Sequence, residues 1–314
     1  MNWLKLLDRH ATKFLAASVF LALALPALAA LLRPLLAPSV WGILVLAMLR
    51  TDWAVFARHV KQPHRIASSL AWILLACPIV LWLALRGLGV ESDGIALAVV
   101  LMASAPPLMS TPALALIIGL DGALALVLML AAMVLAPLVL PFMILGLLGL
   151  EIELSQWEFA GRLLLMVGSA GLVAFALRRR RGAPPVAALE NNANGVVVIL
   201  MLVFAIAIMD GVTPRLAADP MFVVIVLALA FLVQALLQAV TALGFLWLGR
   251  RAAFTVGFLA GNRNMGLLLA TLPAGLHPDI ALYFALAQFP IYILPALLKP
   301  LYGRLMESPR GSAG

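Results

Sequence analysis

The chain has 314 residues, of which 65% are hydrophobic and only 11% are charged, and its mean hydropathy is +1.14. A soluble domain needs far more charge to solvate its surface, so this composition excludes a soluble globular protein and indicates a polytopic membrane protein. The net charge of +8 does not by itself indicate a nucleic-acid partner, because basic residues of membrane proteins are commonly retained on the cytoplasmic side during insertion.

Apolar runs predict ten membrane-spanning helices and leave no room for a domain outside the membrane. Each span needs about 20 residues to cross ~30 Å of hydrocarbon. In chain order the predicted spans are 14–32, 35–49, 66–85, 94–119, 122–149, 160–177, 194–209, 221–249, 252–273 and 280–298. The sequence therefore predicts an all-α protein with a single membrane domain over 1–314.

The basic residues predict the orientation of these spans. With the N-terminus inside, sixteen basic residues fall in cytoplasmic segments and four fall outside, and the opposite orientation would invert this asymmetry. We therefore expect an inner-membrane protein with both termini in the cytoplasm and a basic cytoplasmic linker at about 178–193. The N-terminal segment imitates a secretory signal, but its loss would reverse the asymmetry, so we expect it to stay as the first span. Arg263 alone is not explained by topology.

The two halves of the chain resemble each other at an offset of 158 residues. Segment 120–140 aligns with segment 278–298, which places Asp121 over Asp279 and Pro137 over Pro295. Each half holds five spans, an odd number, so the halves must cross the membrane in opposite directions, as in the inverted repeats of secondary transporters. We predict repeat one over about 14–149 and repeat two over about 160–300.

Each half also has one span that is interrupted at its middle. Span 94–119 contains Ser104, Pro106, Pro107, Ser110, Thr111 and Pro112, and span 252–273 contains Gly257, Gly261, Asn262, Arg263, Asn264 and Gly266. A helix can be broken at membrane depth only where the freed backbone groups find partners in protein, water or ligand. Paired interruptions in corresponding spans predict a substrate site at the repeat interface.

Arg263 lies near the middle of its span, about 15 Å from either end at 1.5 Å per residue. A guanidinium at that depth is costly and cannot lose its charge at physiological pH, so it needs a partner. One interpretation is that carbonyls of the broken helices hold it as a fixed cation. A second is that it also meets the carboxylate of an anionic substrate. A third pairs it with Asp121, Asp210 or another acid brought inward.

Other polar residues inside the spans are weaker candidates. Gln234, Gln238 and Thr241 share one face of the eighth span, and we expect them to make packing hydrogen bonds. Gln288 lies in the tenth span and is kept as a candidate substrate contact. The four histidines have no metal-ligand spacing, and there is no phosphate loop or nucleophile elbow, so we expect no enzyme, no metal site and no cofactor.

Segments 48–85, 104–143 and 257–273 resemble the bile acid:sodium symporter family, within the superfamily of bile acid, arsenite and riboflavin transporters. The resemblance implies ten helices in two inverted five-helix repeats, a panel and a core domain, and broken fourth and ninth helices that cross near the midplane. The function that it implies is secondary transport of organic anions, in many members coupled to sodium.

Most sodium ligands that the resemblance would supply are missing from this chain. The family's side-chain ligand positions fall on Leu259, Arg263, Ile73, Thr111, Pro112, Ala125 and Met129, and only Asn264 matches. Hard cations are held by carbonyl and carboxylate oxygens, which most of these side chains lack. Sodium coupling at these positions is therefore not expected, and protons or facilitated exchange take its place.

The sequence thus predicts a secondary transporter of a small or amphipathic organic anion that works by alternating access, with the anion and the lipid bilayer as partners and no nucleic acid. The candidate substrate-binding residues are Gly261, Asn262, Arg263, Asn264, Ser110, Thr111, Pro112 and Gln288. Two alternatives stay open, a sodium-coupled symporter of bile-acid type or of organic acids, and a transporter-like membrane sensor or structural protein.

Overall fold

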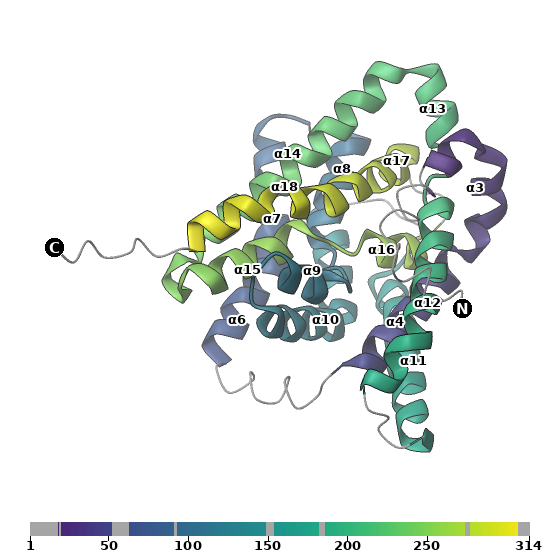
Figure 1. The fold of residues 1–314 in the computed structure, drawn as a ribbon. Coiled ribbons are helices and arrows are strands. Elements are labelled where there is room, and N and C mark those ends of the chain that lie inside the picture. The colour runs from purple at the N-terminus through teal and green to yellow at the C-terminus, as the bar shows by residue number, and fades with distance from the viewer. Residues whose placement is uncertain are drawn as a thin grey trace. The chain divides into compact units, whose positions relative to one another are not determined.

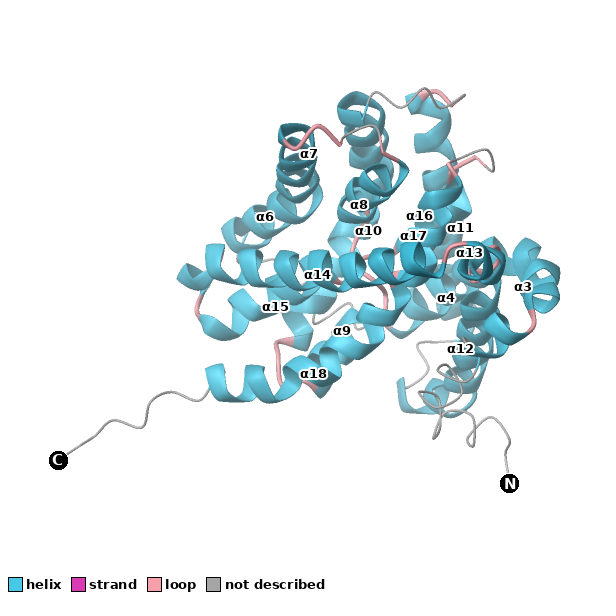
Figure 2. Ribbon diagram, turned by 90° about the horizontal axis from the view of Figure 1, so that it is seen from above, coloured by secondary structure: helices cyan, strands magenta, loops and turns pink. Residues whose placement is uncertain are grey.

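The computed structural model describes residue 18 and residues 20–51, 63–90, 93–148, 154–181, 186–273 and 277–306, and within these ranges every regular element is a helix (Figures 1 and 2). Seven helical runs in the described ranges are long and apolar enough to cross a membrane. The protein is therefore an all-α polytopic membrane protein, as the composition predicted.

The helices follow the apolar runs of the sequence. The first half contains α3 (Pro26–Leu32), the 3₁₀ turn η1 (Arg33–Leu35), α4 (Leu36–Arg50), α6 (Pro63–Ala71), the π-helical turn η2 (Trp72–Ala76), α7 (Cys77–Gly87), α8 (Gly94–Ser104), α9 (Thr111–Ile117) and α10 (Gly122–Leu148). The second half contains α11 (Gln156–Arg181), α12 (Val186–Ala207), α13 (Val212–Ala218), α14 (Pro220–Gly244), the 3₁₀ turn η3 (Leu246–Leu248), α15 (Arg250–Gly261), α16 (Met265–Thr271), α17 (Pro278–Leu286) and α18 (Gln288–Met306).

The two spans predicted to be interrupted are broken, between α8 and α9 and between α15 and α16. Two other boundaries differ from the prediction. The run from Pro26 to Arg50 is helical throughout, with only the turn η1 at the predicted gap between the first two spans. The predicted linker at 178–193 is helical at both ends, because α11 continues to Arg181 and α12 begins at Val186.

The chain folds into two compact units, and each unit is assembled from three separate segments. The first unit comprises Met1–Asp52, Leu150–Ile225 and Met265–Ala285. The second unit comprises Trp53–Gly149, Val226–Asn264 and Leu286–Gly314. All the predicted substrate-binding residues belong to the second unit.

The first unit is built around α4, which packs against α11, α12 and α16. The indole Nε1 of Trp41 in α4 donates a hydrogen bond of 2.9 Å to Ser169 Oγ in α11. Arg178 at the end of α11 donates to the carbonyl oxygens of Leu49 (3.4 Å) and Thr51 (2.7 Å), and so satisfies carbonyls at the C-terminal end of α4.

The second unit is built around α10, which contacts α6, η2, α7, α8, α9 and α15 (Figure 1). Its buried side is marked by Leu128, Ala132, Ala136 and Leu140, which follow each other at helical spacing and are fully buried. Val134, Leu138 and Phe142 are exposed on the same helix. Exposed apolar side chains on so long a helix are suited to lipid rather than to water.

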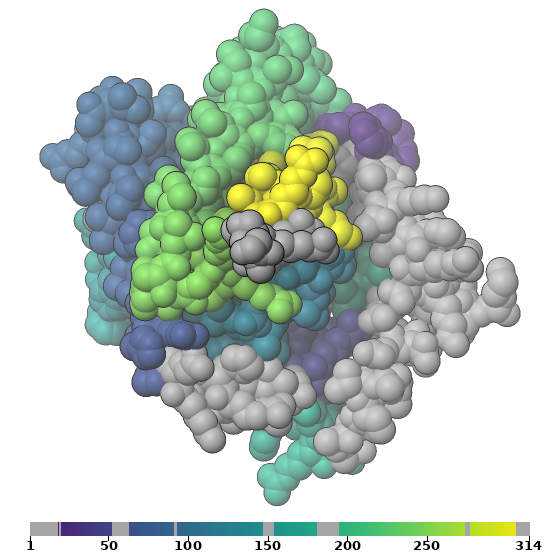
Figure 3. Space-filling model, turned by 60° about the vertical axis from the view of Figure 1, so that its left-hand side comes forward, coloured from purple at the N-terminus to yellow at the C-terminus, as the bar shows by residue number. Residues whose placement is uncertain are grey.

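Helix α14 has two contrasting faces within the second unit. Leu232, Leu236, Val240 and Leu243 are exposed, and side chains of this helix form part of the surface in the space-filling view (Figure 3).

The other face carries the predicted packing residues, and their hydrogen bonds are confirmed. Gln234 Nε2 donates to Ala287 O at 3.0 Å, Gln238 Oε1 accepts from Tyr302 Oη at 3.0 Å, and Thr241 Oγ1 accepts from Trp72 Nε1 at 2.8 Å.

Candidate functional site

The two broken spans meet through their backbones within the second unit. The N–H of Leu108 donates to Asn262 O at 3.0 Å, and the N–H of Asn264 donates to Pro106 O at 2.8 Å. Pro107 and Arg263 lie opposite each other in an antiparallel β-bridge. Extended backbone from one span therefore satisfies extended backbone from the other, which is what a break at membrane depth requires.

Local sequence explains where each span breaks. Ala105 precedes a proline and adopts an extended conformation (φ −60°, ψ 146°), as the clash with the proline ring favours. Pro106 and Pro107 have no N–H to continue the hydrogen bonds of α8. In the second span, α15 ends at Gly261, and Asn262 is already extended (φ −106°, ψ 93°).

The side chain of Arg263 is fully buried at this crossing. Its Nε donates to Ala260 O at 2.6 Å, and its Nη1 donates to Ile73 O and to Ala105 O, both at 2.9 Å. The guanidinium therefore binds three backbone carbonyls from three helical segments, namely η2, the end of α8 and the end of α15.

The carbonyl of Ile73 is available because of the π-helical turn. In this turn the N–H of Cys77 bonds to Trp72 O, five residues earlier. The residue five positions after Ile73 is Pro78, which has no N–H to donate to Ile73 O. The Cys77-Pro78 pair thus leaves a carbonyl inside the span without its helical donor, and Arg263 supplies one.

The other two carbonyls are available because each lies at a helix end. The residue four positions after Ala260 is Asn264, whose N–H is used by Pro106 O across the crossing. Ala105 caps the C-terminus of α8 and is followed by two prolines. The last carbonyls of a helix have no intrahelical partner, so both are natural acceptors for a side chain.

These three bonds offset part of the cost of burying a guanidinium in a membrane span. Hydrogen bonds to charged groups contribute about 1.5–3 kcal/mol each, whereas a central arginine costs ~2.5–3.5 kcal/mol on insertion scales. The carbonyls are neutral, however, so they satisfy donors without cancelling the positive charge. The buried Nη2 has no hydrogen-bond partner among the described residues, and Cys77 is a neighbour of the guanidinium.

The acids considered as partners of Arg263 bind elsewhere. Asp121 Oδ1 accepts from the N–H groups of Ala123 and Leu124, and so caps the N-terminus of α10. Asp210 lies 3.5 Å from Arg33 in the first unit. In the described part of the chain no ion pair involves Arg263, so within the second unit the pairing with Asp121 is wrong.

The structure brings most of the remaining predicted residues to the same crossing. Asn262 Nδ2 donates to Phe258 O at 2.8 Å, and its buried Oδ1 has no partner among the described residues. Thr111 Oγ1 donates to Leu108 O at 2.6 Å, and Pro112 lies in the first turn of α9. Ser110 Oγ is buried without a described partner.

Gly261, in α15, and Gln288, in α18, both lie next to α14. A methyl group at Gly261 would come within 2.7 Å of Gln234 O, so only glycine lets α15 approach α14 this closely. Gln288 is buried at the first position of α18, beside Ala287, whose carbonyl accepts from Gln234 Nε2. These two residues are thus connected to the crossing through α14.

Sequence reasoning missed the part played by the third span. Ile73 was considered only for its side chain, which has no oxygen, whereas the structure uses its backbone carbonyl. The available signal was Pro78, a proline within a predicted span. Cys77, directly before this proline, is a buried free thiol.

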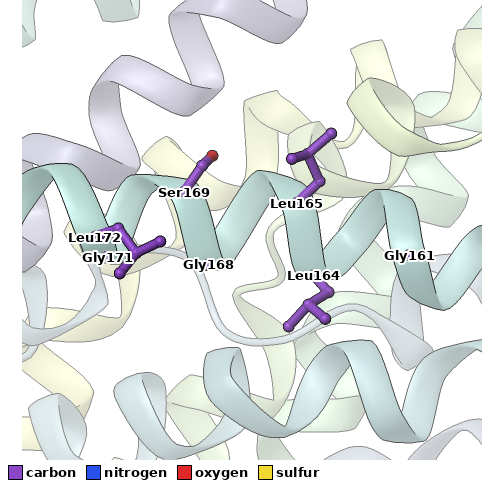
Figure 4. A pocket seen from close by; sticks show the side chains of 7 residues that line it. All are labelled: Gly161, Leu164, Leu165, Gly168, Ser169, Gly171 and Leu172. Atoms are coloured by element: carbon purple, nitrogen blue, oxygen red, sulfur yellow. The ribbon is translucent and has the colours of Figure 1, made fainter.

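A shallow depression elsewhere in the protein does not involve these residues. It runs along α11 in the first unit and is lined by Gly161, Leu164, Leu165, Gly168, Ser169, Gly171 and Leu172 (Figure 4). Its lining is almost wholly apolar and comes from a single helix, so it has no polar groups to orient a charged substrate.

Comparison with models of known protein families and with curated proteins gives no match for this chain. The function is therefore inferred from the crossing of the broken spans and from its arginine.

Proposed function

We propose that this membrane protein is a secondary transporter of a small or amphipathic organic anion, rather than an enzyme, and that Arg263 attracts the anion. The observation that carries this proposal is the buried guanidinium at the crossing, whose three acceptors are neutral carbonyls. Charged groups in membrane spans are characteristic of substrate pathways. A guanidinium that keeps its full charge and one buried nitrogen, Nη2, without a described carbonyl acceptor is suited to a carboxylate.

An inverted repeat is part of this proposal, and the contacts at the crossing support it. The offset of 158 residues that aligns Asp121 with Asp279 also relates Ala105 to Arg263 and Pro106 to Asn264, and both of these pairs are hydrogen-bonded. Equivalent residues contact each other where a pseudo-twofold axis passes between two repeats. Inverted repeats of this kind bind substrate near such an axis, next to discontinuous helices.

The composition of the two units supports division into a panel and a core domain, as in the bile acid:sodium symporter family to which we propose the chain is related. The second unit draws on the third, fourth, fifth and eighth predicted spans and on the first part of the ninth. The first unit draws on the first, second, sixth and seventh, and it also contains the second part of the ninth and the start of the tenth, whose remainder lies in the second unit. In alternating access, the core that carries the substrate site would open in turn to each side of the inner membrane. We propose that both termini lie in the cytoplasm.

Coupling to sodium at the family's positions is not part of the proposal. The side chains of Leu259, Ile73 and Ala125 have no oxygen, and the carbonyl of Ile73 already accepts a hydrogen bond from Arg263. Protons or facilitated exchange are proposed in its place.

A thermal-shift screen of small organic acids, with and without sodium, tests this function. The wild type should be stabilised by at least one organic anion in the absence of sodium, because ligands that bind the folded state raise its stability. Arg263→Gln should lose this response. Sodium alone raising the melting temperature of the wild type would contradict the proposal.

Arg178→Gln is a matched control for the loss of an arginine. Arg178 also donates to two backbone carbonyls, but at the end of α4 in the first unit. This variant should melt at a lower temperature and keep the full stabilisation by the anion. Loss of the anion response in both variants would show that the response follows general stability rather than the Arg263 site.

A further inference from the structure

The carbonyl oxygens around Arg263 belong to three segments that are far apart in the sequence. Ile73 lies in η2, Ala105 caps α8, and Ala260 lies in the last turn of α15. The guanidinium is a hydrogen-bond donor that all three share. This contact ties the third, fourth and ninth predicted spans together at one point inside the second unit.

The arrangement of these oxygens fits a planar group better than a spherical ion. One oxygen lies 2.6 Å from Nε, and the other two lie 2.9 Å from Nη1, so the acceptors are divided between two nitrogens of the guanidinium and do not surround one point. Guanidinium presents its N–H donors in a rigid fork. A hard metal ion requires six or more oxygens around one centre in the case of calcium, and it favours carboxylates. Here the acceptors of the fork are three neutral carbonyls.

We propose that these carbonyls form a guanidinium-binding site that the chain fills with its own side chain. Arg263 is then a tethered cation, which holds the three segments in register without a diffusible ion. Tethering gives the cation a high effective concentration at the site, so a free guanidinium ion needs millimolar concentrations to replace it. This inference goes beyond the proposed function, because it concerns the integrity of the crossing and requires no transported anion.

Rescue of Arg263→Ala by free guanidinium tests the inference. The purified variant, in chloride buffer without organic acids, is melted with and without about 20 mM guanidinium chloride, roughly a hundredfold below its denaturing range. The melting temperature of Arg263→Ala should rise toward that of the wild type. Methylguanidinium should act in the same way, whereas sodium and potassium chloride at equal concentration should not.

Two controls show whether rescue occurs at this site. The wild type should not be stabilised by guanidinium, because its own side chain fills the site. Arg178→Ala should not be rescued either, because Arg178 is only partly buried and donates to Leu49 and Thr51 through a single nitrogen, without a third acceptor for a guanidinium fork among the described residues. An equal response of all three proteins, or rescue by sodium or potassium, would overturn the proposal.

Arg263→Lys keeps the proposal testable if the alanine variant does not fold. A lysine ammonium carries its donors on one atom, so it can replace Nη1 at Ile73 and Ala105 but not also Nε at Ala260. Arg263→Lys should therefore melt between the wild type and Arg263→Gln. A lysine variant that melts together with the wild type would overturn the proposal, because a point charge would then suffice.

Because none of these measurements contains an organic anion, they can fail while anion transport stands. Conversely, rescue by guanidinium can succeed in a protein that transports no anion.

Discussion

At the residue scale, the described residues provide hydrogen-bond acceptors for Arg263 but no negative charge to neutralise it. Three carbonyls accept from Nε and Nη1, so the cost of burying these donors is met within the second unit. The charge itself is not cancelled, because in the described part of the chain no carboxylate lies within salt-bridge distance. An arginine held in this way is rigid and still attractive to an anion, which suits a binding site that must be preorganised.

The link between Pro78 and Arg263 gives a residue-scale prediction. Pro78→Ala supplies an N–H in register for Ile73 O, which Arg263 already occupies in the wild type. In Arg263→Gln the same N–H satisfies an orphaned carbonyl. Pro78→Ala should therefore be more favourable in the glutamine background, with a coupling free energy of about 1 kcal/mol in a double-mutant cycle of unfolding.

Pro300→Ala provides the control for this cycle. Pro300 is an exposed proline inside α18 of the same unit. Its effect should be the same in the wild type and in Arg263→Gln. A Pro78→Ala effect that is also additive would show that the carbonyl of Ile73 does not depend on Arg263.

The sequence was sufficient to single out Arg263 but not to identify its partners. Every other basic residue was explained by topology, so the arginine stood out from charge counting alone. The partners are backbone carbonyls, which every residue has, and which of them is free depends on local helix geometry. A π-helical turn at Trp72–Ala76 leaves little trace in hydrophobic periodicity, because it adds one residue to a run that is apolar on all sides.

At the element scale, α15 packs against α14 along a seam of two glycines. A methyl group at Gly257 would lie 2.5 Å from Gln238 O, and one at Gly261 would lie 2.7 Å from Gln234 O. Both obstacles are backbone atoms of α14, which cannot rotate away as a side chain can. Close approach of backbones through small residues is typical of helix packing in membranes.

Gly257→Ala tests this seam. Overpacking a close contact costs about 1–3 kcal/mol, and here that cost outweighs the gain in helix propensity of about 1 kcal/mol. The variant should therefore unfold at lower temperature or denaturant concentration than the wild type.

Gly146→Ala in α10 is the matched control, because no atom lies within 4 Å of the added methyl group. It should be neutral or slightly stabilising through helix propensity alone. Equal melting temperatures for the Gly257 and Gly146 variants would contradict the close approach of α15 and α14.

The breaks in the two interrupted spans were predictable because proline and glycine change the backbone directly. The break between α17 and α18 at Ala287 was not predicted, although Pro290 in the first turn of α18 has no N–H to donate to Leu286 O. At the break, Gln234 satisfies the carbonyl of Ala287 from another helix. The N-terminal start of α12 at Val186 was also missed, because the polar residues of 190–194 separate its apolar first turn from the predicted span.

At the scale of the whole molecule, the proposed orientation can be tested with single cysteines. The native Cys77 is buried, so the wild type should not react with a membrane-impermeant maleimide. Gly89→Cys, in the turn after α7, should be labelled from outside intact cells. Ser312→Cys, near the C-terminus, should be labelled only after the membrane is opened, because the positive-inside asymmetry places it in the cytoplasm. The reverse labelling pattern would contradict the proposed topology.

The all-α membrane class followed from composition, because so apolar a chain has few other stable forms. The division into two units of three segments each was not predicted from chain order. Contacts between distant segments, such as Trp41 with Ser169 or Arg263 with Ile73, determine it, and these contacts have no pattern within a single span.

Exchange of an organic anion across proteoliposomes tests the central claim most directly. A labelled anion that stabilises the wild type should exchange through it with no sodium on either side. Arg263→Gln should exchange at least about tenfold more slowly, as expected for the loss of a charge-assisted hydrogen bond of roughly 1.5–3 kcal/mol, while Arg178→Gln should exchange at the wild-type rate. Exchange that survives unchanged in Arg263→Gln, or that requires sodium in the wild type, would contradict the account.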